Sequence, residues 1–322
     1  MSIAHAPAKV IITGEHFVVH GQPALAAAVN LYSTVSVEAG SPGIVEISST
    51  ELGVTARFQA GKEGSFIGDG HRMLEPLMLV IEKILDRAGG RGLGLRVRVE
   101  SEIPVGVGLG SSASTAVSTA TAVAGLLGLK LTRDQICELA SVQERSIHKK
   151  PSGIDALVTT YGGVVLFKLG QPPFHLEPTD DVRIVIGNTG ASRSTGDLVS
   201  RMGHRIQMGD MDLMRMSDAV GQITLKAFEA YMRRDFHQLG QLMDENHELL
   251  RQAGVSTSQL DNLVEAARDA GAFGAKLTGA GGGGCMIALC RPDEGGRVSK
   301  AIEAAGGRSY SVAVDRVGVR IG

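Results

Sequence analysis

The sequence predicts an α+β protein with two domains, and three observations lead to that expectation. The chain has 322 residues, and single domains usually hold about 100–200. The first hundred residues alternate apolar and polar side chains as β-strands do, whereas residues 197–253 follow helical spacing almost throughout. Between these parts, residues 171–179 contain three prolines and form the best linker candidate. We therefore expect an N-terminal domain over residues 1–182 and a C-terminal domain over residues 183–322.

The individual elements follow from apolar spacing taken in chain order. Residues 95–100 alternate most clearly, and residues 73–85 place their large apolar side chains on one helical stripe. In the first domain, strands are expected at residues 10–13, 34–38, 44–48, 95–100 and 164–167, and helices at 73–85, 111–127 and 133–147. In the second domain, strands are expected at 183–186, 285–289 and 309–314, with helices within 197–253 and at 258–270.

Charge and cysteine content exclude several classes of protein. The formal net charge is −2, from 32 basic and 34 acidic residues, so no basic field is available to hold nucleic acid or an anionic membrane. The uncharged run 103–129 is long enough to cross a bilayer, but it consists mostly of Gly, Ala, Ser and Thr, which favours a buried helix. The opening residues lack a secretory signal, and three cysteines without CxxC spacing favour a reducing cytoplasm over a disulfide framework or a zinc site.

Glycine is over-represented, with 43 residues, and two loops concentrate it. The first loop is PVGVGLGSSAS, residues 104–114, in which alternating glycines lead into paired serines at a predicted helix start. Glycines allow close approach to the backbone, and a helix start offers free N–H groups, so the loop suits phosphate oxygens. Ser111 and Ser112 add hydroxyls that can contact phosphate or Mg²⁺. No Gly-Lys-Ser/Thr follows, which disfavours an ordinary P-loop.

The second loop is KLTGAGGGGC, residues 276–285, and it contains a formal GxGxxG from Gly279 to Gly284. A dinucleotide-binding fingerprint requires a helix directly after the glycines. The next residues, CMIAL, read as a strand instead. We therefore expect a loop that approaches a neighbouring site closely, and a nucleotide-binding oxidoreductase is disfavoured.

Charged residues in two further segments are candidates for chemistry. ERSIHKKPSGIDALVTTYGG, residues 144–163, supplies Glu144 and Asp155, and APAKVIITGEHFVVHG, residues 6–21, places Lys9 on a strand before the Glu15-His16 turn. Near a phosphate loop, such groups could act as a metal ligand, a base and a charge-orienting cation. Taken alone, each has a simpler interpretation: a solvated carboxylate, an edge lysine whose head reaches solvent, or a surface turn.

Together these segments resemble the GHMP kinase family, whose three motifs are an N-terminal strand and turn, PxGxGLGSSA, and KxTGAGxGG. The resemblance implies a two-domain α+β fold, with a ribosomal-protein-like N-terminal domain and a ferredoxin-like C-terminal domain. The opening segment, residues 144–163, ASRSTGDLV (191–199) and residues 243–264 are similar to the members that phosphorylate the 5-hydroxyl of mevalonate. Departures from the pattern are Val107 and the basic pair Lys149-Lys150.

Position by position, the resemblance implies roles for individual residues, with ATP as co-substrate, mevalonate as substrate and Mg²⁺ as cofactor. The residues expected to bind ATP are Lys9, Ser101, Gly106, Val107, Gly108, Leu109, Gly110, Ser111 and Ser112. Ser112 and Glu144 would hold Mg²⁺, and Asp155 with Lys9 would be catalytic. The residues expected to face the substrate are Glu15, His16, Thr195 and Gly281.

Other interpretations stay open at this point. The runner-up is another GHMP small-molecule kinase, such as one acting on phosphomevalonate, for which Lys149-Lys150 would supply extra positive charge. A non-catalytic GHMP-like regulator is the alternative from a different class. The pattern does not locate the adenine pocket, and it leaves the oligomeric state open, with a homodimer among the options.

Overall fold

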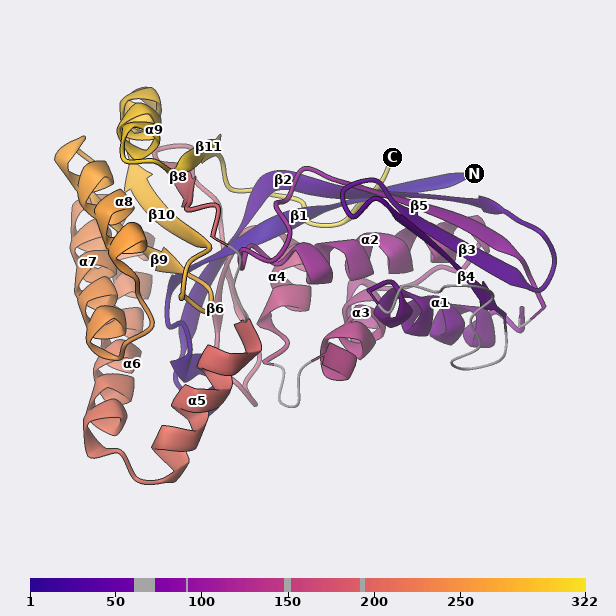
Figure 1. Cartoon of the computed structure of the whole chain (residues 1–322), viewed down its shortest axis with the longest axis horizontal. Helices are drawn as coiled ribbons and strands as arrows, with labels where there is room; N and C mark the ends of the chain where they lie inside the picture. Colours follow the sequence, from indigo (N-terminus) through magenta and orange to yellow (C-terminus); the bar gives the residue numbers. More distant parts are fainter. Residues whose placement is uncertain (61–72, 91, 148–151, 192–194) are drawn as a thin grey trace.

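The computed structural model describes residues 1–60, 73–90, 92–147, 152–191 and 195–322, and these form two sheet-and-helix units that lie side by side along the long axis (Figure 1). The strands are β1 (Ser2–Thr13), β2 (Ala24–Ala39), β3 (Ile44–Ser49), β4 (Val54–Gln59), β5 (Leu95–Ser101), β6 (Val164–Phe167), β7 (Phe174–Leu176), β8 (Arg183–Asn188), β9 (Gly274–Thr278), β10 (Cys285–Cys290), β11 (Arg308–Val312) and β12 (Arg320–Ile321). The α-helices are α1 (Glu75–Arg87), α2 (Ser111–Leu126), α3 (Arg133–Ile147), α4 (Ile154–Tyr161), α5 (Thr195–Gln207), α6 (Met211–Met232), α7 (Phe236–Gln252), α8 (Ser258–Asp269) and α9 (Gly295–Ala304).

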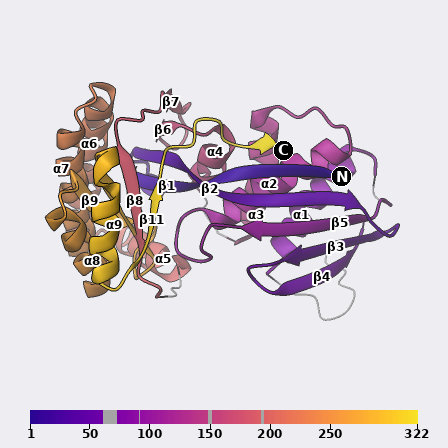
Figure 2. The same ribbon diagram turned by 90° about the horizontal axis from the view of Figure 1, so that it is seen from above.

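The first sheet has the order β12-β1-β2-β5-β3-β4, with β6 paired to β2 and β7 paired to β6. Strands β3 and β5 are parallel, and β4 and α1 connect them. Helices α1, α2 and α3 cover one face of this sheet, and Figure 2 shows the strands in front of them. Because α2 packs against β1, β2, α1, α3 and α4, its small side chains are buried. No helix among the described residues is long and apolar enough to span a bilayer.

The second sheet has the order β11-β8-β10-β9, with antiparallel neighbours throughout. Counted along the chain, that order is 4-1-3-2, which is the ferredoxin-like arrangement implied by the resemblance. Strands β1 and β2 extend toward this unit (Figure 1) and share an apolar core with it. Val10 and Val29 of the first sheet and Ile186 and Ile287 of the second are fully or almost fully buried in that common core. The α+β prediction is confirmed.

The expected elements are present, several of them with longer bounds, and the described residues form six further strands and α-helices. The new ones are β4, β7, β9, β12, α4 and α9. Strand β7 lies inside the segment expected to be a linker and pairs with β6. Strand β9 ends at Thr278, so residues 276–278 belong to a buried strand rather than to the glycine loop. β8 begins at Arg183 and β12 returns to pair with β1; the domain division at residues 182/183 stays a prediction.

Candidate active site

Lys9 and Asp155 form a partly buried ion pair where the glycine loop meets β1. Lys9 Nζ lies 3.0 Å from Asp155 Oδ1, and the two side chains are 6% and 30% exposed. The backbone N–H of Lys9 donates to the carbonyl of Leu109 at 2.9 Å, so the loop covers this part of the strand. Gly153, with a φ of 80°, is the N-cap residue of α4, and Asp155 lies in the first turn of that helix. The edge-lysine interpretation is therefore wrong, and Asp155 remains accessible to a ligand.

The first glycine loop has the conformation that its sequence predicts. Gly106, Gly108 and Gly110 all adopt left-handed φ values, of 74°, 89° and 75°. A Cβ at Gly110 would come within 2.8 Å of Lys9 Cγ, so glycine is needed there for the lysine to pass. The side chains of Val107 and Leu109 are buried in the shared core, which anchors the loop. The loop leads into α2 at Ser111, where free N–H groups and the helix dipole favour an anion.

Helix α3 is joined to the start of α2 by one side-chain hydrogen bond. Gln143 Nε2 donates to Ser112 Oγ at 2.8 Å. Glu144 follows directly on α3 and is half-buried. The two expected Mg²⁺ ligands therefore belong to neighbouring turns of two packed helices, although 31 residues separate Ser112 from Gln143. Sequence reasoning missed Gln143, whose position before Glu144 carries no distinct signal.

The Glu15-His16 turn is buried and strained. Gly14 has a φ of 104°, and a Cβ there would meet the Pro23 carbonyl at 2.5 Å. His16 adopts a φ of 63°, which is uncommon for a residue with a side chain. One ring nitrogen, Nε2, lies 3.0 Å from the carbonyl oxygen of Ala280. Glu15 and His16 are 3% and 6% exposed, so the surface-turn interpretation is wrong.

The second glycine loop, residues 279–284, packs closely on its neighbours. A Cβ at Gly281 would lie 2.0 Å from the Val255 carbonyl, and the N–H of Gly282 donates to that carbonyl at 2.8 Å. Strand β10 begins directly after the loop, and no helix follows the glycines. The loop therefore lacks the context of a dinucleotide site. Through Ala280 and His16 it is joined to the turn after β1.

Three of the expected positions are less directly connected to this site. Ser101 ends β5, and its hydroxyl accepts the N–H of Ile103 at 3.1 Å within a local turn, so its contact with nucleotide stays a prediction. Thr195 begins α5, but its side chain lies outside the described part of the chain, as does the basic pair Lys149-Lys150.

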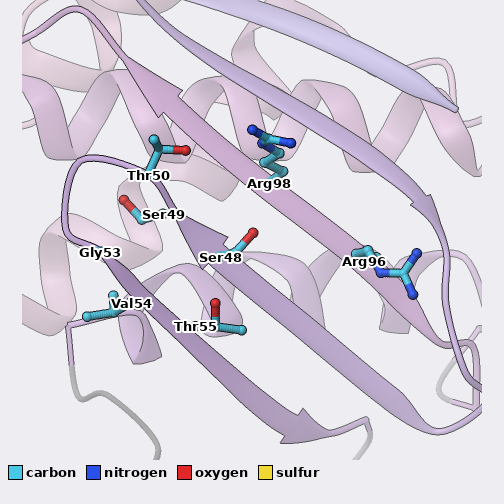
Figure 3. A pocket seen from close by; sticks show the side chains of 8 residues that line it. All are labelled: Ser48, Ser49, Thr50, Gly53, Val54, Thr55, Arg96 and Arg98. Atoms are coloured by element: carbon cyan, nitrogen blue, oxygen red, sulfur yellow. The ribbon is translucent and has the colours of Figure 1, made fainter.

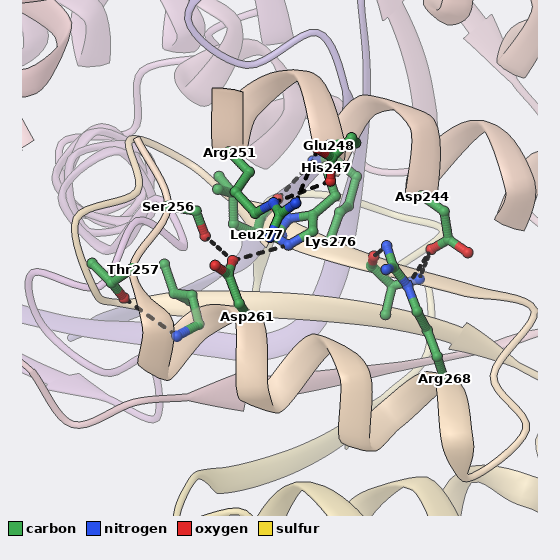
Figure 4. Close-up of polar contacts among 12 residues, drawn as sticks. Asp244, His247, Glu248, Arg251, Ser256, Thr257, Asp261, Arg268, Lys276 and Leu277 are labelled. Carbon is green, nitrogen blue, oxygen red and sulfur yellow. Dashed lines mark hydrogen bonds and ion pairs between the residues drawn. The ribbon is translucent and has the colours of Figure 1, made fainter. Parts of the chain in front are cut away.

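A polar network around Lys276 and His247 (Figure 4) is joined to the Glu15 turn by an ion pair. Lys276 on β9 forms an ion pair with Glu15 and donates to the Leu277 carbonyl at 2.6 Å. His247 on α7 accepts the N–H of Leu277 at Nδ1, 3.3 Å away, and its Nε2 lies 3.2 Å from Asp261. Sequence reasoning assigned no role to Lys276, His247 or Asp261; the available signal was a lysine, Lys276, inside an otherwise apolar strand.

Burial shifts the pKa values of Glu15, Lys276 and His247 toward their neutral forms. Desolvation raises the pKa of Glu15, although the positive charges of Lys276 and Lys9 oppose that shift. Desolvation also lowers the pKa of Lys276, against the attraction of Glu15. The pKa of His247 falls to about 4, first through desolvation and then through repulsion from Lys276. At neutral pH His247 is uncharged and acts as a hydrogen-bonding group.

Two cavities among the described residues lie away from Lys9 and Asp155. One, of about 360 Å³, lies over β3, β4 and β5 (Figure 3). Its cationic side chains are already paired, Arg96 with Glu38 at 2.7 Å and Arg98 with Glu100 at 2.9 Å. The other, of about 340 Å³, lies beside β7 and the end of α6. The glycine loops and the buried ion pairs therefore define the candidate site better than cavity size does.

Comparison with known proteins gives a consistent family assignment. Residues 76–163 match the GHMP kinases N terminal domain, and residues 224–308 match the GHMP kinases C terminal region. The chain is 41% identical to the mevalonate kinase of Thermococcus gammatolerans and 40% identical to that of Pyrococcus furiosus, with 99% of this chain and 98% of each relative covered. The crystal structure of L. major mevalonate kinase in complex with R-mevalonate matches with a TM-score of 0.80 and 28% identity, covering 97% of this chain and 95% of that one. This chain belongs to the GHMP kinase family.

Proposed function

We propose that the protein transfers the γ-phosphoryl group of ATP to the 5-hydroxyl of (R)-mevalonate, giving 5-phosphomevalonate for isoprenoid synthesis. The observation that carries the proposal is the Lys9–Asp155 pair beside the first glycine loop. The choice of substrate rests on the relatives, which are named mevalonate kinases and are about 40% identical along almost the whole chain. None of the three cysteines forms a disulfide, which supports a reducing cytoplasmic setting.

Phosphoryl transfer requires alignment of the reacting oxygens and neutralisation of charge on the transferred group. In this proposal, Asp155 accepts or orients the proton of the attacking hydroxyl, because its carboxylate is partly exposed at the start of α4. Lys9 holds that carboxylate in place and faces the developing negative charge. The glycine loop and the first turn of α2 bind the phosphates through backbone N–H groups, with Ser101, Ser111 and Ser112 contributing hydroxyls.

The residues at the start of α2 and near the end of α3 fit a Mg²⁺ ion. Ser112 and Glu144 both offer hard oxygen atoms, and the Gln143–Ser112 hydrogen bond fixes the two helices against each other. Mg²⁺ is usually bound by one or two protein oxygens together with substrate phosphates and waters, so two protein ligands are sufficient. When bound, the ion would neutralise charge on the β- and γ-phosphates.

On the acceptor side, we propose that Glu15 and His16 contact mevalonate, with Thr195 and Gly281 completing the site. The strained φ of His16 supports a functional role, since left-handed residues with side chains cluster at ligand-binding sites. The contact of the His16 ring with Ala280 would hold the second glycine loop beside the acceptor.

The test is ADP release measured with mevalonate, phosphomevalonate, galactose and homoserine as separate acceptors. We expect ADP release with mevalonate and none with the other three acceptors. Phosphorus NMR of the product should show a phosphate ester coupled to the 5-methylene protons. Comparable turnover of phosphomevalonate would favour a sister GHMP kinase, and an uncoupled tertiary ester would contradict the regiochemistry. ATP binding without turnover of any acceptor would favour a non-catalytic regulator.

A further inference from the structure

Four charged side chains of alternating sign connect the Lys9–Asp155 pair to the interior of the second unit. Asp155 pairs with Lys9 at 3.0 Å, Lys9 attracts Glu15 electrostatically, and Glu15 pairs with Lys276. Of these, Lys276 is fully buried and Glu15 is 3% exposed. The sequence separates Glu15 from Lys276 by 261 positions, so only the tertiary fold joins them.

The charge on Glu15 depends on a small number of neighbours. Lys276 on β9 pairs with its carboxylate directly, and the charge of Lys9 on β1 lowers its pKa to a smaller extent. His16, in the same turn, directs Nε2 at the Ala280 carbonyl. His247 on α7 is neutral near pH 7 because burial lowers its pKa to about 4. The further pair, Asp244 with Arg268 at 2.7 Å, is self-compensating (Figure 4).

A buried carboxylate that loses its cation must either find another cation or take up a proton. For Glu15, Lys9 is a second cation whose charge favours the ionised carboxylate, and it lies on the strand that leads into the Glu15 turn. Lys9 is at the same time the partner of Asp155, the carboxylate proposed to handle the substrate hydroxyl. Without the charge of Lys276, the carboxylates of Glu15 and Asp155 would therefore compete for the ammonium group of Lys9.

We propose that Lys276 is a positioning residue for phosphoryl transfer: by neutralising Glu15, it leaves the Lys9 ammonium with Asp155. This inference rests on the proposed kinase function for its kinetic consequence. Lys276 contacts neither reacting atom in this scheme, and it acts through Glu15 and Lys9. Its burial within β9 and its hydrogen bond to the Leu277 carbonyl hold the ammonium in one place.

The decisive variant is Lys276→Met, which keeps an unbranched side chain but removes the charge. We expect Lys9 to move toward Glu15 and kcat to fall about 10- to 100-fold, the scale of a 1 Å misplacement at a reacting centre, with little change in KM for ATP. Lys300→Met on α9 is the matched control, since that lysine is exposed and far from the site in sequence and fold. It should leave kcat unchanged.

Two readouts separate this role from a merely structural one. In a Glu15→Gln/Lys276→Met double variant, both members of the buried pair are uncharged, so Lys9 keeps Asp155 as its partner. At saturating mevalonate, kcat should then recover relative to Lys276→Met alone, while KM for mevalonate rises because the Glu15 carboxylate is missing from the acceptor site. In Lys276→Met itself, the kcat deficit relative to the wild type should shrink as pH falls, because protonation of Glu15 releases Lys9 to Asp155. A structural role predicts a double variant no faster than Lys276→Met and a deficit that does not change with pH.

If Lys276→Met does not fold, Lys276→Gln retains a hydrogen-bond donor to Glu15 without the charge, and the same pH readout applies. A crystal structure of either variant tests the geometry without any acceptor, so it stays informative if the wild type fails to phosphorylate mevalonate and the proposed function falls. The expected result is a Lys9 ammonium displaced from Asp155 toward Glu15. An unchanged Lys9–Asp155 contact together with an unchanged kcat would overturn the inference.

Discussion

Gly110→Ala is the substitution for which the structure allows the most complete calculation. Gly110 has a φ of 75°, so any side chain there is strained, by about 1–2 kcal/mol for a left-handed residue. The added Cβ would also lie 2.8 Å from Lys9 Cγ, closer than real Cβ atoms approach, and 3.2 Å from Lys9 Cε, which is tighter than most real Cβ contacts. The aliphatic part of the Lys9 side chain must therefore move away from residue 110, and this movement displaces the ammonium group that pairs with Asp155. A displacement on this scale costs about 10²-fold in kcat.

Gly43→Ala provides a matched control for this prediction. Gly43 also has a φ of 75°, but a Cβ there would meet nothing within 4 Å. Both variants should lose about 1–2 kcal/mol of unfolding free energy in urea titrations through backbone strain. Only Gly110→Ala should lose activity with saturating ATP and mevalonate. Equal kcat values for the two variants would refute the inference that Gly110 is required for the placement of Lys9.

Three further predictions concern groups at or near the site. Asp155→Asn keeps the shape of the side chain but removes the proton acceptor, so kcat should fall about 10²–10⁴-fold while ATP affinity by calorimetry stays nearly unchanged; retention of more than a tenth of the wild-type kcat would contradict the role. Glu144→Gln should raise the Mg²⁺ concentration for half-maximal activity, and an unaltered titration would remove Glu144 from the metal site. Because the folded-state pKa of His247 is about 4 and the ordinary value is 6.5, the unfolded chain takes up the proton first as pH falls. The contribution of neutral His247 to the free energy of unfolding is therefore complete above pH 6.5 and declines toward pH 4, by at most about 3 kcal/mol. The free energy of unfolding of the wild type should fall more steeply with decreasing pH than that of His247→Asn, and parallel curves for the two proteins would contradict this.

The spacing of apolar residues along the chain was sufficient to predict most of the helices and strands. Period-2 and period-3.6 spacing predicted strands such as β5 and helices such as α3 with correct or nearly correct bounds. Where pattern failed, the elements were short or contained a polar interruption. Strand β7 has three residues and lies among prolines, and β9 carries Lys276 among apolar neighbours. In both, pairing with an adjacent strand outweighs weak local preference.

The sequence by itself determined the family, the α+β class and the two glycine loops, because motif order and backbone freedom are properties of local sequence. It also singled out Lys9, Glu15, His16 and Asp155 as candidates, although each of them, taken alone, had a simpler surface interpretation. Only the tertiary structure decided between the two, by burying Lys9 against the loop and pairing it with Asp155. The role proposed for Lys276 could be inferred only from the tertiary structure. The ionic state of a buried side chain depends on its solvent exposure and on partners that are distant along the chain.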